Sequence, residues 1–149
     1  MAAAKRIIHV TPESYQDDIS ELRSEIAEHL RNDSFDPSED CPTRVLVSFL
    51  ADHGNWRPQS MVEQQGSAFV SVFREWRQRN RSLAMSDSDF QFHLRKFLHA
   101  TALSYAFNPE TSSIAAVHGL RVSETPNSAY DRRRFLEILK QLTWGSDRI

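Results

Sequence analysis

The feature that most constrains the fold is a pair of amphipathic helical patterns with a short polar break between them. The first pattern places apolar side chains at positions i, i+3, i+4 and i+7, namely Phe69, Val72, Phe73 and Trp76. This spacing puts them on one side of a helix that ends near Arg79. The second pattern starts at residues 86–89, Ser-Asp-Ser-Asp, which resemble a capping box. Its inward side chains are Phe90, Leu94, Phe97 and Leu98.

Strand patterns follow the second helix directly. Residues 102–107 and 114–122 are predicted to be strands, joined by a turn over 108–113. Helix, turn, helix and a two-stranded hairpin is the order of elements in a winged helix. We therefore expect a mainly α fold with a small β-hairpin, closed by a last helix over 128–143. The prediction for residues 61–122 is one shared core that contains Phe69, Phe73, Trp76, Phe90, Leu94, Phe97 and Leu120.

The first part of the chain predicts an amphipathic helical extension. After a short strand over 5–10, residues 11–13, Thr-Pro-Glu, form a helix start. The helix continues to about Asn32, with acidic residues on one face and an apolar stripe on the other, formed by Tyr15, Ile19, Leu22, Ile26 and Leu30. This stripe can pack on its own domain or pair with another chain, which would give a homodimer. A second helix runs from Pro42 to His53-Gly54, and a turn is expected over 55–60.

The charge is divided unequally along the chain. Residues 1–64 carry 6 Lys or Arg against 12 Asp or Glu, whereas residues 65–149 carry 12 against 8. The change suggests a boundary near Gly66, with an acidic helical extension over 1–60 and a winged-helix-like domain over 61–149. One interpretation is that the two halves pair with each other. The other is that the basic half binds a polyanion.

Several classes of function lack the residues that they need. The one cysteine, Cys41, leaves no paired-cysteine zinc site, and the six-residue spacing of His93 and His99 does not suit metal ligands on a helix. Neither a phosphate-binding loop nor a Gly-x-Ser-x-Gly frame occurs. We expect no enzymatic activity, no cofactor and no bound metal. With no apolar run near 20 residues and no secretory signal, an intracellular protein of the nucleus or cytoplasm is expected.

Three stretches carry a resemblance to known DNA-associated modules. They are residues 73–76, Phe-Arg-Glu-Trp; Ser86 with Phe90 and Leu94; and residues 118–122, His-Gly-Leu-Arg-Val. In these the segment from Val47 to Val122 resembles the winged-helix module at the C-terminal end of poxvirus- and phage-type primase-helicases. It is similar, more loosely, to the regulatory-factor-X type of DNA-binding domain. The resemblance implies a role in replication or transcription, without the helicase motor.

The candidate binding residues lie on the two paired helices. Arg95 and Lys96 are expected on the exposed side of the second helix, where cations would neutralise phosphates. Gln91 could read a base edge, because an amide can form a bidentate contact with adenine. Arg74, Arg77 and Arg81 could line a phosphate path, or could form a solvated helix face paired with nearby acids. The turn over 108–113 carries no Lys or Arg.

Two functions remain as hypotheses. The first is non-enzymatic binding of nucleic acid, DNA rather than RNA, by a winged helix. The alternative is a viral or phage accessory protein-interaction module that binds a host protein, to which the acidic helix 13–31 and the uncharged turn would contribute. Arg132, Arg133 and Arg134 open the last helix, where cations oppose the helix dipole. That placement indicates an outside partner, either acidic residues of the first half or phosphate.

Overall fold

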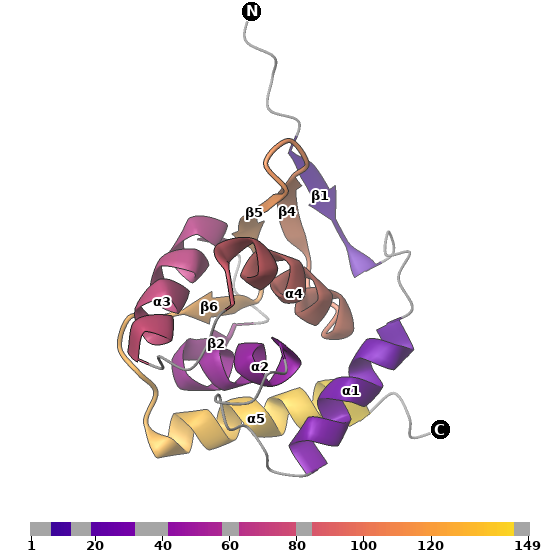
Figure 1. Ribbon diagram of the computed structural model, residues 1–149. Coiled ribbons are helices and arrows are strands. Elements are labelled where there is room, and N and C mark those ends of the chain that lie inside the picture. The colour runs from indigo at the N-terminus through magenta and orange to yellow at the C-terminus, as the bar shows by residue number, and fades with distance from the viewer. Residues whose placement is uncertain (1–6, 13–18, 32–41, 58–62, 80–84, 145–149) are drawn as a thin grey trace, which may run out of the picture.

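A computed structural model describes residues 7–12, 19–31, 42–57, 63–79 and 85–144 (Figure 1). The elements are β1 (Ile8–Val10), α1 (Ile19–Arg31), α2 (Pro42–His53), β2 (Gly54–Trp56), β3 (Gln64–Gln65), α3 (Gly66–Arg79), α4 (Asp87–Ala100), β4 (Tyr105–Asn108), β5 (Ser113–Val117), β6 (Leu120–Val122) and α5 (Ala129–Trp144). The prediction of a mainly helical chain with a small hairpin is confirmed. In the part of the chain that is described, no helix is long and apolar enough to cross a membrane.

Two small antiparallel sheets organise the chain. One has the strand order β1-β4-β5-β3, and the other pairs β2 with β6. The four-stranded sheet lies at one end of the molecule, α1 and α5 lie at the other, and the remaining helices lie between them (Figure 1). The hairpin of β4 and β5 was expected from the sequence. The pairing of β3 with β5 joins the residues just before α3 to those after α4.

The expectation of one strand over 114–122 is wrong. β5 ends at Val117, and the chain turns through Gly119, whose φ of 87° is a left-handed conformation that glycine adopts without strain. After the turn, β6 leaves the hairpin and pairs with β2, so that Asn55 lies opposite Arg121. The turn expected over 55–60 is also wrong at Asn55 and Trp56, because β6 gives them a distant strand partner. Residues 58–60 lie outside the described residues.

The start of α3 packs unusually close to the hairpin. A Cβ atom added to Gly66 would lie 1.8 Å from the carbonyl oxygen of Ile114, so any side chain here would displace β5. Just before it, the amide of Gln64 accepts from the Val122 N–H at 2.7 Å and donates to the Val122 carbonyl at 3.0 Å. Through these two hydrogen bonds to the backbone of Val122, the side chain of Gln64 in β3 links the four-stranded sheet to β6 of the other sheet.

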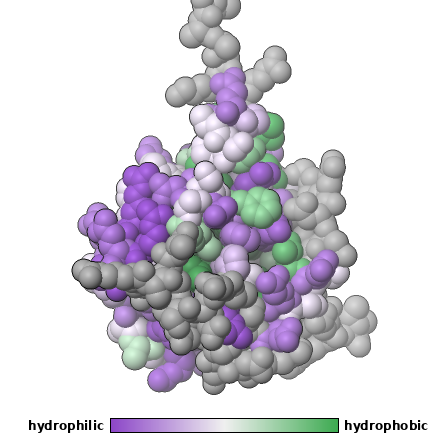
Figure 2. All heavy atoms as spheres, in the orientation of Figure 1, coloured by the Kyte–Doolittle hydropathy of each residue, from purple (hydrophilic) through white to green (hydrophobic). Residues whose placement is uncertain are grey.

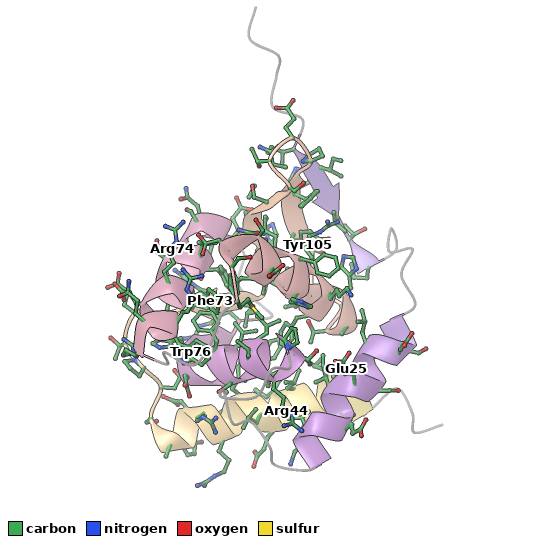
Figure 3. All side chains as sticks on the ribbon, viewed as in Figure 1. Glu25, Arg44, Phe73, Arg74, Trp76 and Tyr105 are labelled. Carbon is green, nitrogen blue, oxygen red and sulfur yellow. The ribbon has the colours of Figure 1, made fainter. Side chains whose placement is uncertain are left out.

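An aromatic cluster fills the space between α2, α3 and α4. Phe49 makes edge contacts with Phe73, Trp76 and Phe90, and Phe73 stacks on Phe90 with ring centroids 4.2 Å apart. Phe73 and Trp76 point from α3 into this cluster (Figure 3). The predicted shared core is confirmed: its seven residues belong to one buried cluster.

The first half of the chain contributes to the same core. Along α1, Ile26 and Leu30 are buried and Leu22 is partly buried, so this length of the apolar stripe packs on its own chain. Tyr15 lies outside the described residues. From α2, Phe49 and Leu50 are fully buried. The boundary near Gly66 therefore marks a change of charge, whereas one continuous core extends across it.

Candidate nucleic-acid interface

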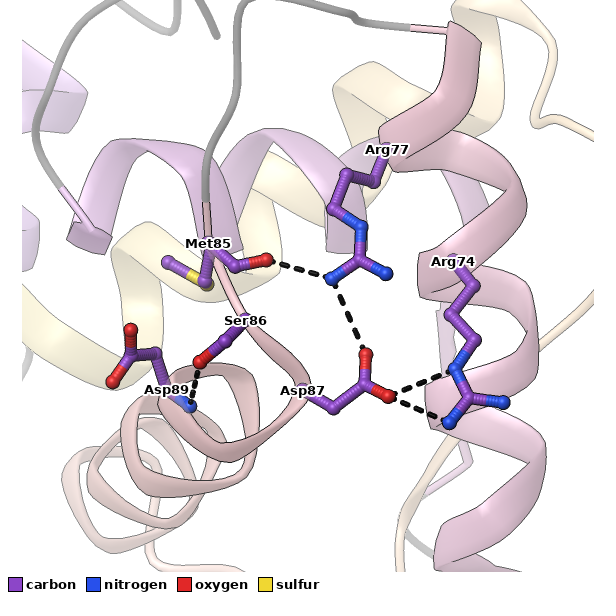
Figure 4. Close-up of polar contacts among 6 residues, drawn as sticks. All are labelled: Arg74, Arg77, Met85, Ser86, Asp87 and Asp89. Carbon is purple, nitrogen blue, oxygen red and sulfur yellow. Dashed lines mark hydrogen bonds and ion pairs between the residues drawn. The ribbon is translucent and has the colours of Figure 1, made fainter.

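The exposed side of α4 and the neighbouring turn form the candidate site. Ser86 caps the helix, since its Oγ accepts from the Asp89 N–H at 3.1 Å (Figure 4), as the sequence predicts. Because Phe90, Leu94, Phe97 and Leu98 are buried, the opposite face of the helix is the one that faces outward. That surface carries Ser88, Gln91, Phe92, Arg95 and Lys96.

Arg95 is held in place on this surface by two aromatic side chains. Its Cζ lies 3.8 Å from the ring centroid of Phe107, a cation–π contact. Its Nε donates to the hydroxyl of Tyr105 at 3.2 Å, and the same hydroxyl is hydrogen-bonded to Nε2 of His99 at 2.6 Å. Arg95 is half-buried, and these contacts hold its guanidinium in position.

Lys96 and Phe92 lie together one turn apart. The Nζ atom of Lys96 is 4.4 Å from the ring centroid of Phe92. Phe92 is 52% exposed, unlike the buried phenylalanines of the same helix. Phe92 was not among the predicted site residues, although its position off the inward stripe of α4 was a signal that could have identified it.

Gln91 has a structural contact that the sequence did not reveal. Its Oε1 accepts from the backbone N–H of Ile114 at 2.9 Å, which ties α4 to β5. The amide oxygen is thus engaged by the hairpin, and a bidentate contact with adenine would require this bond to break. The Nε2 group of Gln91 can still donate a hydrogen bond.

The predicted arginines of α3 contact the start of α4 (Figure 4). Arg74 donates from Nε and Nη2 to Oδ2 of Asp87, at 2.9 and 2.6 Å. Arg77 donates from Nη1 to the Met85 carbonyl at 2.7 Å and to Oδ1 of Asp87 at 3.2 Å. The hydrogen bonds from Arg74 hold the pKa of Asp87 below its ordinary value, and they raise the pKa of Arg74. Arg81 lies outside the described residues.

Two hollows meet on α4. The first, the α3–α4 groove, lies beside the β4–β5 turn and is lined by Val70, Arg74, Asp87, Ser88, Gln91, Phe92, Arg95, Thr111, Ser112 and Ser113. The second, the α1–α4 groove, is lined by Glu21, Leu22, Glu25, Phe92, Arg95, Lys96 and His99. Phe92 and Arg95 line both hollows. Three of the six predicted site residues, Arg74, Gln91 and Arg95, thus share the first groove, and Lys96 lines the second.

The turn contributes hydroxyl groups to the first groove in place of cations. Thr111, Ser112 and Ser113 lie along its edge. Hydrophilic residues also cover the outer side of α3 (Figure 2). Hydroxyls and backbone N–H groups can donate to phosphate oxygens, so a turn without Lys or Arg can still contact a nucleic-acid backbone.

Acidic side chains of α1 border the same cations. Glu21 and Glu25 line the α1–α4 groove together with Arg95 and Lys96. Glu25 lies on the side of α1 that faces α2 and α4 (Figure 3), and its Oε1 accepts from the Thr43 hydroxyl at 2.7 Å. Behind Lys96, burial lowers the pKa of His93, and the nearby charge of Lys96 lowers it further. The acidic and basic halves of the chain therefore meet at this groove.

Comparison of the chain with protein-family models, with curated proteins and with solved structures finds no match. Among the residues that the structure describes, no three potential His, Cys, Asp or Glu metal ligands lie together. The geometry of α4 and its surroundings is accordingly the main indication of function.

Proposed function

We propose that the chain is a non-enzymatic nucleic-acid-binding protein with a winged-helix arrangement, which binds DNA in replication or transcription. The element order α2, β3, α3, α4, β4, β5 supports this arrangement. So does the strand order β4-β5-β3, in which the strand before α3 pairs with the second strand of the hairpin. In a winged helix, the helix at the position of α4 is the one presented to a groove of the nucleic acid.

The observation that carries the proposal is the group of side chains on α4. A fixed arginine, a lysine, an exposed phenylalanine and an amide lie on one surface, at the junction of two hollows. The two cations can neutralise phosphates. Phe92 offers an aromatic face on which an unpaired base can stack, and Gln91 offers an amide donor. Together these groups can contact both the phosphate backbone and a base of a nucleic acid.

The accessory-module hypothesis finds less support on the described surface. Exposed apolar side chains along helix 13–31 would favour it, but Ile26 and Leu30 are buried against the chain's own core. The exposed Phe92 is flanked by Lys96 and Arg95, which suits a polyanion better than an uncharged partner. A protein partner is therefore the conclusion only if the binding test below finds no binding to oligonucleotides.

The test is a titration of the full chain with labelled duplex and single-stranded oligonucleotides at about 50 and about 200 mM salt. We expect weak binding, with a log–log salt slope of roughly −3 to −4 if about four phosphates are neutralised. Lys96→Gln should make the salt slope shallower by about 0.9, whereas Lys96→Arg keeps the charge and should retain the native slope. Phe92→Leu keeps an apolar side chain but removes the ring, so it should weaken single-strand binding more than duplex binding.

A conservative substitution is needed at Arg95, because truncation of this side chain also removes its packing on Phe107. Arg95→Lys keeps the charge and should preserve the salt slope while the thermal midpoint falls. Absence of binding to either oligonucleotide at the lower salt would overturn the proposal and leave α4 as a protein-docking surface. If Lys96→Gln and the native chain bind oligonucleotides with equal affinity, the binding site does not lie on α4.

A further inference from the structure

A second cationic surface lies on the β2–β6 ribbon and α5. Arg57, Arg121 and Arg134 are exposed, and among the described residues none of their side chains has an ion pair or a hydrogen bond. The cations of the α3–α4 side differ, because Arg74, Arg77 and Arg95 all have internal partners. Three cations able to accept a new anionic partner therefore lie away from α4, in addition to Lys96 on α4 itself.

The strand register places two of these arginines on one face of the ribbon. Asn55 lies opposite Arg121, and the Arg57 N–H donates to the Gly119 carbonyl at 2.8 Å, which extends the ladder one residue beyond the Trp56–Leu120 pair. Side chains two residues apart on a strand point to the same face, so Asn55, Arg57 and Arg121 share it. Arg57 and Arg121 are diagonal neighbours across the two strands.

The third arginine comes from α5, across a hollow at the edge of β2. This hollow is lined by Gly54, Asn55, Trp56, Arg57, Asp131, Arg134, Phe135 and Ile138. Arg57 and Arg134 supply two cations and Asn55 supplies an amide. Asp131 is the one acid among these lining residues. We call Asn55, Arg57, Arg121 and Arg134 the β2–α5 surface.

Aromatic packing fixes this surface and separates it from α4. Trp56 stacks on Phe135 with ring centroids 4.9 Å apart, and its Nε1 donates to the Phe135 carbonyl at 3.2 Å. Its ring also stacks on Phe97, which belongs to the buried side of α4, at 6.0 Å. The core therefore lies between the β2–α5 surface and the outer side of α4.

We propose that the β2–α5 surface binds the phosphate backbone of a second nucleic-acid segment, so that one protein molecule joins two segments. This inference rests on the proposed function of α4. A guanidinium offers paired N–H donors that match two phosphate oxygens, and Asn55 adds a further donor. Two phosphate-binding faces on opposite sides of one small core cannot easily follow a single straight duplex. A second segment satisfies both faces.

The experiment mixes the full chain with two populations of a short duplex, one carrying a donor fluorophore and the other an acceptor. Energy transfer is expected only where protein joins the two duplexes. The triple variant Arg57→Gln, Arg121→Gln, Arg134→Gln should lose the energy transfer, retain binding of one duplex, and show a salt slope shallower by about two to three. Arg133→Gln changes the charge one residue from Arg134, outside the lining of the hollow, and should keep the energy transfer.

Sedimentation of the complex shows whether one protein molecule or a dimer holds the two duplexes. One protein with two duplexes is the expected result. Single-duplex binding by the native chain without energy transfer would overturn the second surface and leave the α4 proposal intact. Full energy transfer by the triple variant, equal loss in Arg133→Gln, or two proteins in each bridged complex would also overturn it. If the native chain binds neither duplex nor single strand, the proposed function of α4 in nucleic-acid binding is overturned as well.

Discussion

Arg74 and Asp87 join α3 to the first turn of α4, with both Nε and Nη2 of the arginine donating to one carboxylate oxygen, at 2.9 and 2.6 Å. The other carboxylate oxygen accepts from Arg77 at 3.2 Å. One acidic side chain thus fixes the angle between the two helices and offsets part of the charge of two predicted phosphate contacts. It also begins α4, where a negative charge favours the helix dipole.

The first prediction concerns Asp87 and acid stability. Its folded pKa lies below the ordinary value, mainly because of the hydrogen bonds from Arg74. The stabilisation is therefore present above the unfolded pKa of about 3.9 and is lost as pH falls through the folded pKa. In Asp87→Asn, the thermal midpoint should be lower near neutral pH and should fall less between about pH 4 and about pH 2. Solvent screening keeps the effect small, since the Asp87 side chain is 37% exposed.

The control for this measurement is Asp89→Asn, which removes another acid from the same turn of α4. It should lower the midpoint less than Asp87→Asn near neutral pH, because Asp89 makes no contact with either arginine in Figure 4. Identical curves for the two variants would show that the helix dipole, and not the arginine contacts, accounts for the effect of Asp87.

The second prediction concerns His93 and mildly acidic pH. Burial first, and then the charge of Lys96, lower the folded pKa of His93. As pH falls below about 6.5, the unfolded chain takes up a proton on this residue before the folded chain does, so stability decreases. His93→Gln should reduce the drop in thermal midpoint between about pH 7 and about pH 5. His9→Gln, at an exposed position of β1, should leave the drop nearly unchanged; an equal reduction there would contradict the assignment to His93.

The third prediction concerns the acidic border of the α1–α4 groove. Glu21 and Glu25 repel phosphate where Arg95 and Lys96 would attract it, so Glu21→Gln with Glu25→Gln should strengthen oligonucleotide binding. We expect a several-fold gain at low salt that shrinks as salt rises, because screening weakens the repulsion. Glu28→Gln is the matched control, since Glu28 is exposed on α1 outside this groove. A truncation of residues 1–60 would not serve, because it removes the buried side chains of α2.

The fourth prediction concerns the core that positions α4. Trp76 is 2% exposed, contacts Phe49 and Phe73, and donates from Nε1 to Asp52 at 2.9 Å. Trp76→Ala should lower the free energy of unfolding by about 3–5 kcal/mol through the cavity that it leaves. Tyr130→Ala, at a position 65% exposed, should change it by less than about 0.5 kcal/mol. Denaturant titration of both variants provides the comparison, and a small loss in Trp76→Ala would mean that α3 packs differently.

Local patterns in the sequence were enough to predict the helices and the hairpin. The spacing of apolar residues located α2, α4 and α5, and Ser86 located the start of α4, because helix periodicity and capping involve neighbours within one or two turns. The same spacing identified the shared core. The charge of the chain changes near Gly66, but the buried core is continuous across this point.

Tertiary structure alone decided how the strands outside the β4–β5 hairpin pair and which cations have partners. β2, β3 and β6 are two or three residues long, too short for a periodic signal, and each is stabilised by a partner far away in sequence. Arg74 was predicted either to line a phosphate path or to pair with nearby acids, and Arg95 to be an exposed cation. Asp87 and Phe107 approach them only when α3, α4 and β4 pack together. The sequence by itself determined which segments are helical and which faces are apolar, since those follow from neighbouring residues. The exposure of Phe92 and the grouping of Arg57, Arg121 and Arg134 depend on long-range packing, which the order of residues does not show directly.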